Sequence, residues 1–199
     1  MKLERPTHIQ KTNRSSGWMS DFTEEIPGQI AAIIKRLGDG RYTSTSIYPL
    51  PADAAYDEDV HPSEWIQTTG VAPDRLTVEI KQRDSTGVHR LYTIGHPEAA
   101  AETAETEIIY NGDNEYLVRP AEVLTAADAI ELFQHYYDTH SVPAGWHLRE
   151  QPEFADTSVE EHLKSQAAVG DEKTARGRAP VAGQSATPPK SQEKPRVGE

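Results

Sequence analysis

The stretch YDEDVHPSEW, residues 56–65, concentrates side chains that could do charge-based chemistry. It contains four carboxylates, no Lys or Arg, and an aromatic residue at each end. The residues concerned are Tyr56, Asp57, Glu58, Asp59, Glu64 and Trp65. A calcium loop needs oxygen ligands at alternating positions, a central glycine and a terminal bidentate glutamate, and the stretch lacks that spacing. Two interpretations stay open: a solvated insert, or a loop that imitates nucleic-acid phosphates towards a basic protein.

Histidines are the next side chains that could bind a metal ion. His135, Asp138 and His140 form the closest cluster of such residues. Positions five apart do not share a helix face, so the two histidines of this cluster are not arranged to bind one ion. The sequence therefore predicts no metal site, and no cofactor is expected.

Motifs of nucleophilic or phosphate chemistry are absent from the sequence. It has no GxSxG elbow, Walker loop, dinucleotide fingerprint or HExxH pair. With no cysteine there is no thiolate nucleophile, disulfide or cysteine-ligated metal, and the zinc-deaminase signature is excluded as well. The distance between two carboxylates, on which glycoside hydrolysis depends, is not visible in a sequence. We therefore do not expect an enzyme.

The three tryptophans, Trp18, Trp65 and Trp146, allow two interpretations. Packing against a small core is the first for each of them. An aromatic residue beside charged residues is also a typical anchor in a protein interface. Trp65 and Trp146 therefore join the acidic stretch as candidate partner-binding residues.

The negative charge is concentrated in one part of the chain. Residues 1–154 hold 25 acidic and 13 basic residues, which accounts for the whole net charge of −12, and the remaining residues hold seven of each. Such a surface repels nucleic acid and anionic membranes and attracts basic partners. A surface that serves solubility alone is the alternative. We expect no direct binding of nucleic acid or membrane.

Composition predicts one domain with unpacked appendages. Hydrophobic residues make up 36% and aromatic residues 7% of the 199 residues, and the mean hydropathy is −0.69. No run reaches the roughly 18 apolar residues of a membrane span, and the first residues lack the apolar core of a signal peptide. Together with the absence of cysteine, these features predict a cytoplasmic protein.

The chain divides into three parts by composition. We predict a flexible N-terminus over residues 1–16, a single α+β domain over 17–154, and a disordered low-complexity tail over 155–199. The tail is dominated by Gly, Pro, Ala, Ser and mixed charges, which cannot bury enough apolar surface to offset chain entropy.

Periodicity predicts two helices and an antiparallel meander. One helix is expected within residues 23–38, with Pro27 in its first turn, and another after an N-cap at Thr125 paired with Asp128. In the second helix, the apolar stripe is expected to be Ala126, Ile130, Phe133 and Tyr137. Strands are expected at 41–48, 75–82, 88–95, 105–110 and 115–120. The expected fold is an α+β domain, with a four- to five-stranded antiparallel meander packed against an N-terminal and a C-terminal helix.

The order of these elements resembles a known family. Its features here are the hairpin turn from Tyr110 to Gly112, the Arg119-Pro120 pair, a helix with A-x-x-A-x-x-x-F spacing, and a closing P-x-x-W. The last two correspond to Ala126, Ala129, Phe133, Pro143 and Trp146. In these features the chain resembles the α+β immunity proteins of bacterial polymorphic-toxin systems that are often paired with nucleic-acid deaminase or nuclease toxins. The resemblance covers about residues 25–150. The chain departs from it in the long acidic insert at 51–65 and in a helix exit, THSVPAGW, without the usual glycine.

The resemblance implies a cytoplasmic inhibitor that occludes the active site of a cognate toxin domain. Because a toxin that acts on nucleic acid presents a basic groove, the acidic stretch is expected to enter that groove, with its aromatic ends as anchors. A secretion chaperone or adaptor that binds a client without inhibiting it is the alternative. A small enzyme with an unrecognised site is a third hypothesis.

Overall fold

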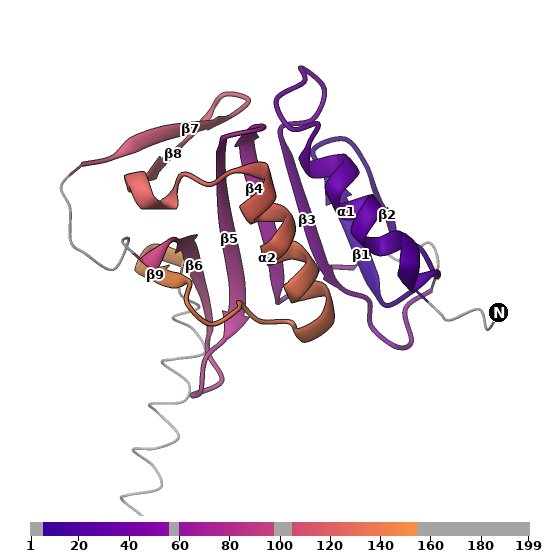
Figure 1. Ribbon diagram of the computed structural model, residues 1–199. Helices are drawn as coiled ribbons and strands as arrows, with labels where there is room; N and C mark the ends of the chain where they lie inside the picture. The colour runs from indigo at the N-terminus through magenta and orange to yellow at the C-terminus, as the bar shows by residue number, and fades with distance from the viewer. Residues whose placement is uncertain (1–5, 56–59, 98–104, 155–199) are drawn as a thin grey trace, which may run out of the picture. The chain divides into compact units, whose positions relative to one another are not determined.

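Seven antiparallel strands form one sheet in the computed structural model, which describes residues 6–55, 60–97 and 105–154 (Figure 1). In spatial order they are β2 (Ser16–Trp18), β1 (His8–Thr12), β3 (Ser44–Pro49), β4 (Trp65–Val71), β5 (Arg75–Arg83), β6 (His89–Gly95) and β9 (His147–Glu150). Two further strands, β7 (Glu107–Asn111) and β8 (Asn114–Val118), form a separate hairpin. The fold is thus mixed α and β around a large antiparallel sheet, as predicted.

The predicted count of four to five strands is wrong. Strands β1, β2, β4 and β9 were not expected, and the β7–β8 hairpin lies outside the sheet that was to include it. The N-terminus, expected to be flexible up to residue 16, includes β1, where Ile9 is buried opposite Tyr48. Its sequence, HIQKT, has little strand character of its own. Pairing with β2 and β3 supplies the hydrogen bonds that hold it.

Strand β5 matches the strand expected at 75–82, and its side chains are buried on both faces of the sheet. Leu76, Val78 and Ile80 point to one face and are fully buried. Thr77 and Glu79 point to the opposite face and are also buried. This strand is therefore covered on both faces, which its polar residues did not indicate.

Two helices cover one face of the sheet. Helix α1 (Ile26–Ile34) follows a short 3-10 turn, η1 (Thr23–Glu25), and has Pro27 in its first turn, as predicted. Helix α2 (Ala126–Thr139) begins at the predicted N-cap. The Thr125 hydroxyl accepts from the Asp128 amide at 3.2 Å, and the Asp128 carboxylate accepts from the Thr125 amide at 2.9 Å. This reciprocal pair satisfies amides that the first turn leaves unpaired.

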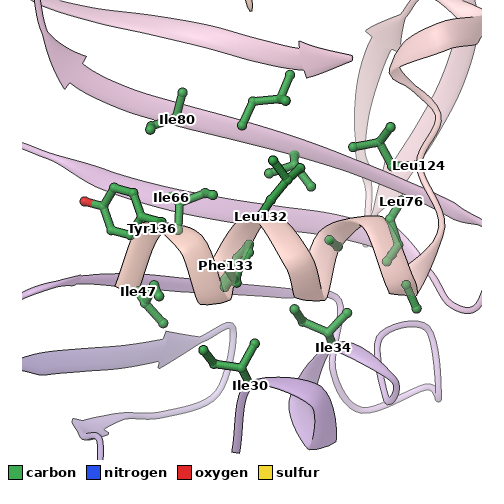
Figure 2. Packing of buried hydrophobic residues seen from close by; sticks show 14 of the residues in the cluster. Ile30, Ile34, Ile47, Ile66, Leu76, Ile80, Leu124, Leu132, Phe133 and Tyr136 are labelled. Atoms are coloured by element: carbon green, nitrogen blue, oxygen red, sulfur yellow. The ribbon is translucent and has the colours of Figure 1, made fainter. Parts of the chain in front are cut away.

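The main hydrophobic core fills the space between these helices and the sheet (Figure 2). Its largest fully buried side chains include Ile30, Ile34, Ile47, Ile66, Leu76, Ile80, Leu132, Phe133 and Tyr136. The face of α2 is rotated from the predicted stripe. Leu132 and Tyr136 are buried, whereas Ile130 and Tyr137 are only partly buried. Helix α2 packs against α1 as well as the sheet, and this double contact selects its buried face.

A smaller cluster lies on the opposite face of the sheet. It consists of Ile9, Tyr48, Leu50 and Ala54, with Trp18, Val60 and Trp65 partly buried beside them. Alternation explains the division, because Tyr48 and Trp65 are direct chain neighbours of the core residues Ile47 and Ile66. The sheet thus has an apolar layer on each face, but only one is covered by helices.

Two short 3-10 turns, η3 (Pro120–Glu122) and η4 (Pro152–Phe154), complete the described elements, which all belong to one compact unit of residues 1–157. None of the helices in the described ranges is both long and apolar enough to cross a bilayer. The predicted tail, 155–199, lies outside the described residues.

Candidate functional site

A groove of about 600 Å³ lies between the helix-free face of the sheet and strand β8. Its floor is made by side chains of the sheet and of the residue after β9: Trp65, Glu79, Leu91, Thr93, Arg149 and Gln151. Residues 114–118 of the hairpin form a wall, and Glu153 and Phe154 of η4 complete the rim. Strand pairing positions the floor, since Glu79 stands opposite Thr93, and Thr93 opposite Arg149. A polar row therefore crosses three neighbouring strands under the groove.

Glu79 is the buried carboxylate of that row. Its residue surface is only 7% exposed, and the Gln151 side-chain amide donates to its Oε1 at 2.7 Å. The same amide nitrogen lies 2.8 Å from the Thr93 hydroxyl oxygen. Burial raises the pKa of Glu79, and the Gln151 hydrogen bond and the charge of Arg149 oppose that rise. Glu79 is thus a partly satisfied carboxylate in a largely dehydrated site.

Arg149, by contrast, is already paired. Its guanidinium donates to both carboxylate oxygens of Glu122, at 2.6 and 2.8 Å, and Glu122 is fully buried. The Arg119 backbone amide donates to the same carboxylate at 2.8 Å. Such a bidentate pair holds η3 against β9 and neutralises the arginine charge. The groove lining therefore retains an excess of negative charge from Glu79, Glu115 and Glu153.

Exposed apolar side chains concentrate on the β7–β8 hairpin, and two of them line the groove. The large hydrophobic residues that the described structure leaves exposed are Val71, Ile108, Tyr110, Leu117 and Phe154. Three of the five lie on the β7–β8 hairpin, and Leu117 and Phe154, 66% and 57% exposed, line the groove itself. An apolar patch beside carboxylates is typical of a surface that binds another protein.

The groove lining combines carboxylates with aromatic side chains. Its lining, in the part of the chain that the structure describes, includes no His, Cys, Ser or Lys that could serve as nucleophile or base beside Glu79. The described residues also contain no group of three or more His, Cys, Asp or Glu that could hold a metal. A buried carboxylate beside aromatic side chains is suited to hold a cation.

The structure describes three of the seven predicted site residues, Glu64, Trp65 and Trp146. Tyr56, Asp57, Glu58 and Asp59 lie outside the described residues. Glu64 accepts a hydrogen bond from the Arg83 backbone amide at 3.0 Å and so has a structural partner.

The two candidate tryptophans lie in different places. Trp65 belongs to the smaller apolar cluster and lines the groove. Trp146 packs against the main core and stacks on His96, with ring centroids 4.9 Å apart. Trp65 thus lies at the groove and Trp146 at the main core, and partner binding stays a prediction for both.

His135 and His140, which are close in the sequence, have different partners in the described structure. His140 lies against His8 of β1, with their Nε2 atoms 3.0 Å apart, and the Nε2 of His135 lies 3.4 Å from the Ser141 hydroxyl instead. Burial, followed by the nearby charge of His140, lowers the pKa of His8 to about 4. This pair joins β1 to the end of α2.

Sequence reasoning missed Glu79, Glu122, Arg149 and Gln151. Glu79 is a polar member of an alternating strand, and such residues ordinarily face solvent. A usable signal was present in the hairpin, where Ile108 and Tyr110 alternate with Ile109, which is buried. Apolar residues on both faces of a two-stranded hairpin indicate that each face contacts something.

Comparison with protein-family models, with curated proteins and with solved structures finds no match.

Proposed function

We propose that this chain is an immunity protein that acts in the cytoplasm of the producing cell. It binds a cognate secreted toxin domain, a deaminase or nuclease acting on nucleic acid, and occludes its active site. The observation that carries the proposal is the groove beneath β8, which combines an excess of carboxylates with exposed apolar side chains. The family resemblance of residues 25–150 supplies the class of partner.

The groove and a toxin that acts on nucleic acid are expected to have complementary surfaces. A toxin that acts on nucleic acid must hold phosphates, so its active site is surrounded by Lys and Arg. An acidic surface accelerates its encounter with such a site, and apolar contacts slow dissociation. The hairpin residues Ile108, Tyr110 and Leu117 supply apolar area, and Glu115 and Glu153 supply charge.

Trp65 connects this surface to the acidic stretch. It is the last residue of that stretch, the first residue of β4 and part of the groove lining. A partner seated on the groove would therefore contact the residue at which the acidic stretch ends. We propose that the stretch and the groove serve one interface.

Co-expression with a toxin domain sought among the products of the neighbouring genes tests the proposal. We expect rescue of growth and co-purification of the two proteins. The double variant Glu115→Lys, Glu153→Lys should weaken both, whereas Glu24→Lys, Glu131→Lys is the matched double charge reversal away from the groove. Absence of a complex together with absence of rescue would refute the immunity function.

A secretion adaptor is the second candidate, because the exposed hairpin residues Tyr110 and Leu117 would serve a client protein equally well. Deleting residues 155–199 separates the two functions. An immunity protein is expected to keep neutralising its toxin, whereas an adaptor that docks through its tail is expected to lose delivery of its client.

A further inference from the structure

The floor of the groove presents a carboxylate with unused hydrogen-bonding capacity. Gln151 occupies Oε1 of Glu79, and among the described residues no hydrogen bond reaches Oε2. Arg149, the basic residue of the described lining, donates to Glu122 instead. Glu79 Oε2 is not among the fully buried atoms without a partner, so it is accessible to a ligand, and a donor to it would offset part of the cost of burying this carboxylate.

Aromatic side chains accompany this carboxylate. Trp65 lies on the floor, Tyr116 on the wall and Phe154 on the rim of the same groove. The faces of such rings attract cations. A guanidinium is the best suited of the protein cations, because it is planar and weakly hydrated. The two rim carboxylates, Glu115 and Glu153, add attraction from the solvent side.

The volume of about 600 Å³ falls within the range of ligand pockets, roughly 300–1,000 Å³. It exceeds what one side chain needs, so a protein loop could enter with the residues that flank its cation. A loop of a basic partner is therefore a better match than a free ion.

We propose that the groove is a receptor for one arginine side chain of the toxin domain. The guanidinium donates to Oε2 of Glu79 and lies against Trp65 or Tyr116, and the exposed hairpin residues hold the flanking loop. This inference rests on the proposed immunity function and identifies Glu79 as the residue that selects the partner. An arginine side chain held in the groove is no longer available in the toxin active site, where it would bind substrate phosphates.

A peptide titration tests the groove without the toxin. The full-length protein is titrated with acetyl-Gly-Arg-Gly-amide at millimolar concentration, and the indole N–H signal of Trp65, assigned with Trp65→Phe, is followed by NMR. Matched peptides carry Lys or Gln in place of Arg. We expect a saturable shift with Arg, a weaker one with Lys and none with Gln.

Variants locate the site. Glu79→Gln keeps the size of the side chain and an acceptor for Gln151 but removes the charge, and it should abolish the arginine-dependent shift. Glu131→Gln on α2 removes the same charge outside the groove and should leave the shift unchanged. Equal responses to the Arg and Gln peptides, or an undiminished shift in Glu79→Gln, would overturn the inference.

The chain's own tail is the competing occupant, since it contains Arg176, Arg178 and Arg196. A variant with these three arginines changed to Gln is compared with the unaltered protein in the absence of peptide. Identical Trp65 signals support a partner's arginine. A displacement of that signal in the direction opposite to the shift caused by the Arg peptide would show that the tail occupies the groove, and would overturn the proposal.

Binding to the toxin domain separates this inference from the function on which it rests. We expect Glu79→Gln to raise the Kd of the complex at least about tenfold, a loss of roughly 1.4 kcal/mol. A complex that forms and neutralises the toxin but is indifferent to Glu79→Gln overturns the arginine receptor alone. A protein that binds the arginine peptide but no toxin overturns the immunity function and leaves the receptor site standing.

Discussion

The two faces of the sheet carry different kinds of side chain. Towards the helices, Ile47, Ile66 and Ile80 are fully buried within an almost entirely apolar layer. On the opposite face, Glu79 and Thr93 are nearly as well buried but belong to a polar row. Burying an aliphatic side chain contributes about 1.5–3 kcal/mol to folding, whereas a buried carboxylate opposes folding unless it is paired. The helix-covered face therefore supplies the stability that permits a polar groove on the other.

A second contrast lies within the groove face itself. Glu122 receives three hydrogen bonds from Arg149 and the Arg119 amide, whereas Glu79 receives one from Gln151. A fully paired buried carboxylate holds structure together, and a partly paired one retains capacity for a ligand. We therefore expect removal of the Glu122 charge to lower the stability of the protein and removal of the Glu79 charge to raise it.

The largest effect should follow from truncating the helix-covered core. Phe133→Ala is expected to lower the free energy of unfolding by about 3–5 kcal/mol, because it leaves a cavity between α2 and the sheet. Phe154→Ala is the matched truncation on the groove rim and should lower it by less than about 1 kcal/mol. Urea unfolding measures both. Similar losses would contradict the conclusion that the helix-covered face of the sheet supplies the stability.

Breaking the paired carboxylate should be the next largest change. Glu122→Ala leaves the Arg149 charge without its partner, and a loss of about 3 kcal/mol is expected by urea unfolding. Replacing both residues in Glu122→Ala, Arg149→Met should recover part of that loss, because no uncompensated charge remains. A double variant no more stable than Glu122→Ala would argue against this account.

Acidification should act through the His8–His140 pair. The pKa of His8 is lowered to about 4 in the folded protein, so folding favours the neutral ring. Its contribution to stability is complete above the unfolded pKa of about 6.5, and it is lost as pH falls through about 4. The urea midpoint should fall between pH 7 and pH 4.5, and more steeply than in His8→Gln. Parallel pH profiles for the two proteins would rule out this origin.

The smallest stability change should be a gain. Because burial raises the pKa of Glu79, its ionised form at pH 7 opposes folding. The Glu79→Gln variant should therefore be more stable than the unaltered protein at pH 7, and the difference should disappear below about pH 4.5, the ordinary range of a glutamate. Thermal unfolding at both pH values measures this difference. A loss of stability at pH 7 would mean that Glu79 serves the fold rather than a ligand.

Local chemistry made part of this architecture predictable. Thr125 and Asp128 form a capping pair from side chains three positions apart, so nothing distant is needed to define that helix start. The β7–β8 hairpin likewise follows from its turn sequence. Strand β1 was not predictable in this way, because its polar residues form a strand only through pairing with β3.

The candidate site was predictable only in part. Trp65 was identified from its position beside acidic residues, and it does line the groove. Glu79, Arg149 and Gln151 come from strands that are distant in sequence, and no local pattern distinguishes them from solvent-exposed polar residues.

The sequence by itself determined the acidic character of residues 1–154, the helix starts and the alternation of β5, because charge, capping and periodicity depend on residue type and short spacing. Only the tertiary structure decided which polar residues are buried. Glu79 and Glu122 are both glutamates in regular local surroundings, yet one is left with a single side-chain partner and the other is enclosed by Arg149. Burial and partnership arise from side-chain contacts between segments far apart in the chain, and only the folded chain brings those segments together.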